Sequence, residues 1–271
     1  MTQRLDTRFA KLKAEGRAAL VTFTMAFDPD RATAQTLLNA LPQAGADVIE
    51  LGIPFSDPMA DGPIIQEAGL RALKAGASLK GVLEMVAAFR KTNADTPVIL
   101  MGYYNPIFHY GGEAFAADAA KAGVDGVILV DLPPEELGEL QPAADKHGLA
   151  LVRLIAPTTG DARLAMMLQG ARGFAYYIAV AGITGQLSAD LDVLEQRVRH
   201  LKSLTDLPLA VGFGVKTPEQ SARIGGFADA VVVGSAIVSS LHTRGVDDTI
   251  GLVRQLADSL QANTPGKIAR A

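Results

Sequence analysis

Three acidic residues lie close together in residues 50–63, which read ELGIPFSDPMADGP. Glu50 follows the apolar pair Val48-Ile49, whereas Asp57 and Asp61 stand among three prolines that restrict the backbone. A carboxyl group buried at the end of a strand has a raised pKa and can donate a proton, while a second carboxylate on a stiff loop can stay ionised. The segment therefore predicts acid/base chemistry, with Glu50 and Asp61 as the best-placed pair.

Glycine-rich turns follow three apolar runs later in the chain: GITG at 182–185, GFG at 212–214, and Gly234-Ser235. Glycines let backbone N–H groups approach an anion, and a helix beginning at Ser235 would present its amino end to negative charge. These turns predict a phosphate site. The alternative is that they are tight turns that need small residues.

Other kinds of chemistry find little support in the sequence. The apolar run at 173–178 reads GFAYYI and carries no lysine for a Schiff base, and Lys216 is interpreted as a solvated residue near a helix start. The four histidines are scattered without ligand spacing, and the chain has no cysteine. We therefore expect proton transfer by carboxylates and no metal site.

The elements that must position these residues alternate along the chain. Helical spacing occurs at 31–44, 113–122, 135–147, 191–204 and 218–224. Between these segments lie eight short apolar runs without polar alternation, as in parallel strands covered on both faces: 19–24, 48–51, 98–101, 126–130, 150–155, 174–178, 209–212 and 230–233.

This order predicts an α/β fold, a single-domain (β/α)8 barrel of the TIM type spanning 1–271, with an open doubly wound sheet as the alternative. Extra helices are expected at 5–15, within 66–90 as a pair after the second strand, and at 246–263, followed by a frayed tail over 264–271. In such barrels the chemistry sits on the loops at the carboxyl ends of the strands, where all the candidates fall.

Composition excludes several classes of protein. The 271 residues are 49% hydrophobic, and the formal net charge of -4 gives no general attraction for nucleic acid. The charged amino-terminal segment lacks a signal-peptide core, and no apolar stretch reaches the length of a membrane span. We expect a cytoplasmic protein that contacts neither nucleic acid nor membrane.

The motifs together resemble those of tryptophan synthase alpha subunits. Residues 50–63 resemble the signature loop of that family. The resemblance continues in order through YYNP at 103–106, DLPPEE at 131–136, APTT at 156–159, GITG at 182–185, GFG at 212–214 and GSA at 234–236. It covers nearly the whole chain.

The resemblance implies a reversible retro-aldol cleavage of indole-3-glycerol phosphate to indole and glyceraldehyde 3-phosphate. Glu50 would protonate the indole C3 carbon and take the glycerol hydroxyl proton, and Asp61 would bond the indole N–H. Asp57 is assigned to loop closure or partner contact. The family further implies an α2β2 heterotetramer with a beta subunit that receives the indole for condensation with serine. Pyridoxal phosphate is expected only in that partner, and no cofactor in this chain.

The substrate pocket implied by the resemblance draws on many strand ends. Its members match, or lie beside, family positions around indole, glycerol and phosphate: Phe23, Ile65, Met101, Tyr103, Ile128, Tyr176, Thr184, Gly185, Phe213, Gly214, Gly234 and Ser235.

Two departures from the family pattern affect loops. Val180 stands where some members carry arginine, so closure of that loop would be weaker or differently held, and Val130 stands where proline is expected.

Two other functions compete with this interpretation. One is another phosphate-binding barrel enzyme of the same pathway, although an indole-glycerol-phosphate-forming enzyme would use a lysine acid that the matching strand ends lack. The other is a regulatory partner that binds ligand and activates a beta subunit with little or no chemistry of its own.

Overall fold

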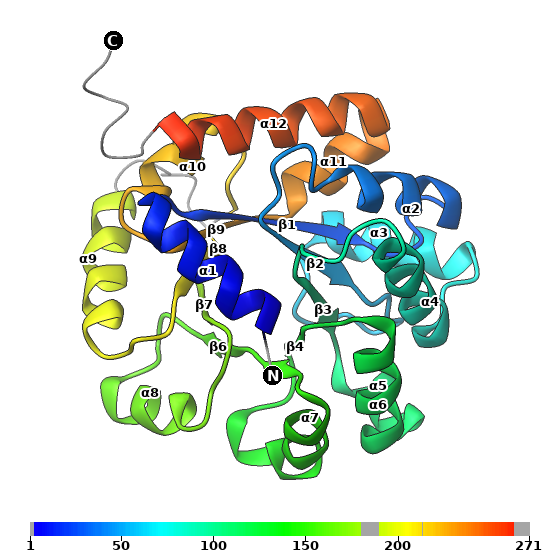
Figure 1. Ribbon diagram of the computed structural model, residues 1–271, viewed down its shortest axis with the longest axis horizontal. Helices are drawn as coiled ribbons and strands as arrows, with labels where there is room; N and C mark the ends of the chain where they lie inside the picture. Colours follow the sequence, from blue (N-terminus) through cyan, green and yellow to red (C-terminus); the bar gives the residue numbers. More distant parts are fainter. Residues whose placement is uncertain (1–2, 180–189, 213, 263–271) are drawn as a thin grey trace.

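A closed barrel of parallel strands forms the centre of the protein (Figure 1). The computed structural model describes residues 3–179, 190–212 and 214–262. Its sheet runs in the order β5-β4-β3-β2-β1-β9-β8-β7-β6. The two strands at the ends of this order, β5 (Ala150–Leu151) and β6 (Arg153–Ile155), are separated along the chain by Val152 alone. The sheet therefore closes on itself, which confirms the predicted barrel and rejects the open sheet.

The remaining strands follow the predicted runs within one or two residues. They are β1 (Ala19–Met25), β2 (Val48–Gly52), β3 (Val98–Gly102), β4 (Gly126–Leu129), β7 (Ala175–Ile178), β8 (Leu209–Gly212) and β9 (Ala230–Val233). The run at 150–155 was predicted as one strand and is divided at Val152.

Helices surround the barrel and include the three predicted additions, α1, the pair α3 and α4, and α12 (Figure 1). The helices are α1 (Gln3–Glu15), α2 (Arg31–Ala40), α3 (Pro63–Lys74), α4 (Leu79–Arg90), α5 (Tyr104–Tyr110), α6 (Gly112–Ala122), α7 (Gln141–His147), α8 (Asp161–Leu168), α9 (Asp190–Ser203), α10 (Pro218–Gly225), α11 (Ser235–Arg244) and α12 (Val246–Ala262).

Proline explains two errors in the predicted helices. The helix predicted at 31–44 ends at Ala40, just before Pro42, which has no N–H for the helical ladder. The helix predicted at 135–147 is divided into a 3-10 helix, Pro134–Glu139, and α7, which carries Pro142 in its first turn. Helices α5 and α8 were not predicted, and they have only 7 and 8 residues.

The barrel interior is apolar, and α1 closes its amino-terminal end. Leu5, Phe9 and Leu12 of α1 join the cluster of inward-facing strand residues. The ring of Phe9 lies 5.7 Å from that of Phe174, which enters β7. Burying these side chains fixes α1 across this end.

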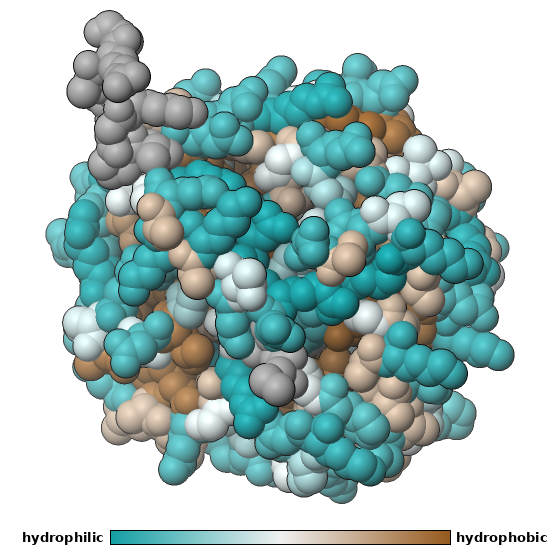
Figure 2. Space-filling model, in the orientation of Figure 1, coloured by the Kyte–Doolittle hydropathy of each residue, from teal (hydrophilic) through white to brown (hydrophobic). Residues whose placement is uncertain are grey.

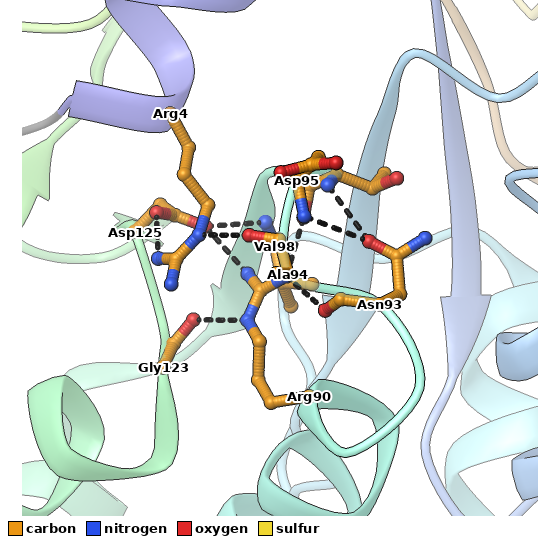
Figure 3. A network of polar contacts seen from close by, with 9 residues as sticks. Arg4, Arg90, Asn93, Ala94, Asp95, Val98, Gly123 and Asp125 are labelled. Atoms are coloured by element: carbon orange, nitrogen blue, oxygen red, sulfur yellow. Dashed lines mark hydrogen bonds and ion pairs between the residues drawn. The ribbon is translucent and has the colours of Figure 1, made fainter.

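A network of polar contacts anchors α1 at the same end (Figure 3). Asp125, just before β4, accepts hydrogen bonds from the Val98 N–H at 2.8 Å and from Arg90 at 2.7 Å. Arg4 of α1 donates to the other oxygen of Asp125 at 2.9 Å. These structural contacts hold the amino-terminal end, and the chemistry of such barrels lies at the carboxyl ends of the strands.

No helix in the described ranges is long and apolar enough to span a membrane. The single-domain assignment stays a prediction, and the tail predicted at 264–271 lies outside the described residues.

Candidate active site

Glu50 is a buried carboxyl group without a partner. It is the middle residue of β2, its exposed fraction is 1%, and neither carboxyl oxygen has a hydrogen-bond partner among the residues described. Burial raises the pKa of Glu50 from 4.5 to about 8. Such a group is protonated at neutral pH, and because no neighbour holds its proton, it can give the proton to a bound molecule.

The surroundings of Glu50 are apolar side chains and one tyrosine. Phe23 of β1 and Ile99 of β3 are in register with Glu50, so their side chains lie on either side of it on the same face of the sheet. Burial raises the pKa of Tyr176 well above its usual value, and the charge of Glu50 raises it further. Glu50 and Tyr176 therefore lie in one poorly solvated region, where a charge on either disfavours a charge on the other.

Two glycines provide the room for the rings in this region. A Cβ atom on Gly52 would lie 2.7 Å from the ring of Phe23, and one on Gly212 would lie 2.5 Å from the hydroxyl of Tyr176. Gly212 was predicted to belong to a phosphate turn, and Gly52 had no predicted role. The available signal was a glycine inside a strand, which often marks close approach of another group.

Asp61 lies half-buried on the loop between β2 and α3, beside Tyr103. Burial raises the pKa of Asp61, and a hydrogen bond with Tyr103 opposes this by lowering it. The Tyr103 side chain is 2% exposed, its pKa is raised to about 12, and its hydroxyl accepts the Ala60 N–H at 2.9 Å. Tyr103 therefore keeps its proton and can donate it to the Asp61 carboxylate, which favours the ionised form.

The loop that carries Asp61 is fastened by its own neighbours. Gln66 donates from Nε2 to the carbonyl oxygen of Asp61 at 2.8 Å and to that of Pro58 at 3.3 Å. The rings of Phe55 and Tyr103 lie 5.2 Å apart. These contacts hold Asp61 in place, and nothing in the sequence pattern singled out Gln66 for that role.

Asp57 lies apart from the two other acids. Its side chain is exposed, and its carboxylate accepts a hydrogen bond from the Ser56 hydroxyl at 2.6 Å. The structure therefore leaves Asp57 on the outer side of the loop.

The other predicted pocket residues divide into buried and open positions. Phe23 and Ile128 are buried, whereas Ile65 and Met101 are partly exposed. Tyr176 keeps a small accessible part, and the rest of its side chain packs against the inward-facing cluster. Met101 and Ile128 are in register on neighbouring strands, so they share one face of the sheet.

The predicted phosphate turns are placed only in part. Gly234 lies against Phe23, because a Cβ there would be 3.4 Å from the Phe23 Cβ. Ser235 begins α11 as predicted, and Gly214 has a φ of +66°. The remaining predicted positions, Val180, Thr184, Gly185 and Phe213, lie outside the described residues.

A cavity lined by neither Glu50 nor Asp61 lies away from these carboxylates. It has a volume of about 820 Å³ and lies at the opposite end of the barrel, between α1 and the segments that lead into β7 and β8; Phe9, Lys13 and Pro208 are among its lining residues. Figure 2 shows the face that carries α1, where hydrophilic residues predominate around smaller apolar patches. A second cavity, of about 260 Å³, is lined by residues that follow β4 and β6, including Asp131 and Thr159. Size alone would therefore point away from Glu50, but the perturbed carboxyl groups define the candidate site.

No metal-binding cluster competes with this site in residues 3–179, 190–212 and 214–262, where no three His, Cys, Asp or Glu side chains are grouped to hold an ion. The arrangement described is a buried acid, a second carboxylate with a tyrosine donor, apolar walls and a helix amino end. It suits proton transfer to an apolar ring that carries an anionic tail.

Comparison with known proteins gives a consistent result. The family model described as tryptophan synthase alpha chain matches residues 9–264. A crystal structure of tryptophan synthase subunit alpha from Legionella pneumophila is 42% identical and superposes with a TM-score of 0.88, covering 95% of this chain and 98% of that one. A tryptophan synthase chain from Mycobacterium tuberculosis, in an open form with BRD0059 bound, is 36% identical with a TM-score of 0.87, covering 95% and 98%.

Proposed function

The chain belongs to the tryptophan synthase alpha chain family, and on that basis we propose that the site around Glu50 and Asp61 performs the family's lyase reaction. That reaction is the reversible cleavage of indole-3-glycerol phosphate to indole and glyceraldehyde 3-phosphate. The observation that carries the proposal is the buried, unpartnered Glu50 carboxyl group with its pKa raised to about 8.

Glu50 acts first as an acid and then as a base. Protonation of the indole ring at C3 makes the ring electron-poor, so that it can leave with the electrons of the carbon–carbon bond. The glycerol hydroxyl on the adjacent carbon loses its proton to the Glu50 carboxylate and becomes the aldehyde oxygen. One proton enters and one is recovered, so Glu50 returns to its acid form at the end of the cycle.

Asp61 stabilises the ring during this step. Protonation at C3 places positive charge on the ring nitrogen, and an ionised carboxylate bonded to the N–H offsets that charge. The Tyr103 hydrogen bond favours the ionised form of Asp61. Two carboxyl groups with different surroundings thus take different roles, one kept protonated by burial and the other favoured in its charged form by the Tyr103 hydrogen bond.

The remaining predicted residues bind the substrate without reacting. Tyr176 offers a hydroxyl group beside Glu50. The apolar walls that contact the indole ring are formed by Phe23, Ile65, Met101, Tyr103, Ile128, Tyr176 and Phe213. The phosphate rests at the amino end of α11 and the glycine turns, with Thr184, Gly185, Gly214, Gly234 and Ser235 as its proposed partners.

A beta subunit is the proposed partner, in an α2β2 assembly. Large apolar side chains stand exposed on neighbouring connections at the carboxyl ends of β2 and β3, Met59 at 80% and Phe108 at 63%. Exposed apolar residues beside a site suggest a protein contact, and Asp57 lies on the same loop as Met59. This chain needs no cofactor in the proposal, pyridoxal phosphate being the partner's, and its cytoplasmic location stays a prediction.

Indole release by the purified chain tests the reaction. Wild type should form indole from indole-3-glycerol phosphate, and Glu50→Gln, which keeps the shape but cannot donate an acid proton, should lose at least about a hundredfold in kcat. Asp57→Asn serves as the control on the same loop and should keep its kcat. Full turnover by Glu50→Gln would refute the acid/base role.

Adding a beta subunit separates the regulatory function from the catalytic one. A wild-type chain that is inert alone but stimulates the beta subunit would favour the regulatory interpretation. Size-exclusion chromatography of the mixture tests the surface, since Met59→Asp should weaken co-elution if the exposed connections form the contact.

A further inference from the structure

Arg197 of α9 links two neighbouring strand ends from outside the barrel. Its Nη2 donates to the main-chain oxygen of Thr159 at 2.5 Å. It also forms a hydrogen bond with Tyr177 of β7, whose side chain is 6% exposed. One side chain on α9 therefore contacts both the segment after β6 and the strand β7.

The Thr159 end of this link is a tight turn directly after β6. The Ala156 N–H donates to the Thr159 hydroxyl at 3.1 Å, and the Thr159 N–H donates to the Ala156 oxygen at 3.0 Å. Arg197 binds the main-chain oxygen of Thr159 at the far end of this turn. The turn is therefore held both within itself and from α9.

Helix α9 also contacts Asp161, the first residue of α8. Asp161 lies 3.8 Å from Arg197 Nη1, and both of its oxygens lie 3.0 Å from Nε2 of His200, one helical turn further along α9. Helices α8 and α9 occupy the same side of the molecule (Figure 1). The contacts therefore form a clamp, defined here as Arg197 and His200 of α9 holding Thr159 and Asp161.

Arg197 is not an ordinary solvated surface arginine. Its side chain is 25% exposed, and its Nε is buried without a hydrogen-bond partner among the described residues. Leaving a buried N–H unpaired costs stability, so the remaining contacts of the guanidinium must offset that cost. Arg199, two residues along the same helix, is 65% exposed and bonds Glu195 on its own helix.

The strand ends that Arg197 ties together are the pair that positions Tyr176. Strands β6 and β7 are in register, with Leu154 opposite Tyr176 and Ile155 opposite Tyr177. Tyr177 faces outward to Arg197, so the preceding residue, Tyr176, faces inward to the region of Glu50. A shift of Tyr177 would move Tyr176 with it, and the Tyr176 ring packs directly against Gly212.

We propose that Arg197 is a positioning residue for the cleavage reaction, holding the β6 and β7 wall of the substrate pocket through Thr159 and Tyr177. The inference rests on the proposed function and adds a residue to which neither the sequence motifs nor the family resemblance assigned a role. Arg197 touches no reacting atom, so its removal loosens the pocket without changing the acid. The effect falls on substrate binding more than on the chemical step.

Steady-state kinetics of the full-length chain test this proposal. Arg197→Leu should raise the KM for indole-3-glycerol phosphate about tenfold and change kcat by less than about twofold. Arg197→Lys keeps the charge and can reach one acceptor, so it should recover part of the KM. The matched control Arg199→Leu removes a guanidinium from the same helix and should leave both constants unchanged.

A double-mutant cycle with Tyr177→Phe identifies the route. Tyr177→Phe keeps the ring and removes the hydroxyl, so it should raise KM by itself but add little in the Arg197→Leu background. Additive effects on KM would contradict the shared link. Tyr177→Phe and Arg197→Lys also keep the test available if Arg197→Leu does not fold.

The outcomes separate this inference from the function on which it rests. A wild-type chain and an Arg199→Leu chain that both fail to release indole would refute the function. An active wild type together with an unchanged KM in Arg197→Leu would refute the positioning role alone. A lowered thermal midpoint in Arg197→Leu with unchanged KM would show that the clamp is structural, which also overturns the proposal.

Discussion

Burial of Glu50 makes the stability of the fold depend on pH, and Glu50→Gln isolates that dependence. The group is an acid whose pKa rises from 4.5 in the unfolded chain to about 8 in the folded one. Below pH 4.5 it is protonated in both states and contributes no pH-dependent cost. Between the two values the unfolded chain releases the proton and the folded chain keeps it, so folding becomes less favourable as the pH rises.

The magnitude follows from the same pKa change. Each pH unit between the two values costs about 1.4 kcal/mol, which amounts to about 3 kcal/mol at pH 7 and about 5 kcal/mol well above pH 8. Glutamine has nearly the same shape and does not titrate, so the variant lacks this cost. The stability of Glu50→Gln relative to wild type should therefore increase by about 4 kcal/mol between pH 5 and pH 8.5.

Urea unfolding followed by circular dichroism measures this change. The total free energy of unfolding, summed over all transitions, is compared for wild type and Glu50→Gln at pH 5, 7 and 8.5. Asp57→Asn, which removes an exposed acid from the adjacent loop, should follow the wild-type curve. A difference between Glu50→Gln and wild type that stays constant with pH would refute the reasoning, because it would mean that Glu50 titrates alike in both states.

Three further predictions concern single contacts. Tyr103→Phe removes the hydrogen bond that lowers the pKa of Asp61, so that pKa should rise and the acid limb of the kcat/KM profile should move to higher pH; an unmoved limb would separate Tyr103 from Asp61. Gly212→Ala places a Cβ 2.5 Å from the Tyr176 hydroxyl, so the ring must shift. Cleavage kinetics should show a KM raised several-fold, as expected for a displaced pocket wall. An unchanged KM would show that the ring moves freely. Asp125→Ala removes the carboxylate that pairs with the guanidinium of Arg90. It should lower the free energy of unfolding, measured in urea titrations, by about 3 kcal/mol. A loss under about 1 kcal/mol, as for a surface ion pair, would contradict the structural role of Asp125.

The fold could be predicted from the sequence because the barrel strands are short, apolar on both faces and separated by helical segments. The run at 209–212 was predicted to the residue, since the turn after it contains glycine and cannot prolong the strand easily. The division at Val152 could not be predicted, because it depends on how the neighbouring strands curve to close the sheet. The break at Pro142 had a local signal that the helical spacing around it obscured.

The candidate site could be predicted as a set of residue types but not as an electrostatic arrangement. Glu50 stood out because it follows an apolar run, and that position alone indicates the direction of its pKa shift. Its proximity to Tyr176, 126 residues away along the chain, depends on the register of the whole barrel. The bond between Asp61 and Tyr103 likewise joins the ends of two different strands.

Arg197 shows why a residue can be important to a site and still be invisible in the sequence. It lies in a segment that reads VLEQRVRHLK, where charges at helical spacing normally indicate a solvated face. Arg197 and Arg199 look alike there, and only the packing of α9 against the end of β6 separates them. The guanidinium of Arg197 holds two strand ends in position, so its role becomes visible only in the folded structure, where these strands lie side by side. In a barrel every pocket wall has a helix behind it, and a side chain on the inner face of that helix can therefore control substrate affinity without contacting the substrate.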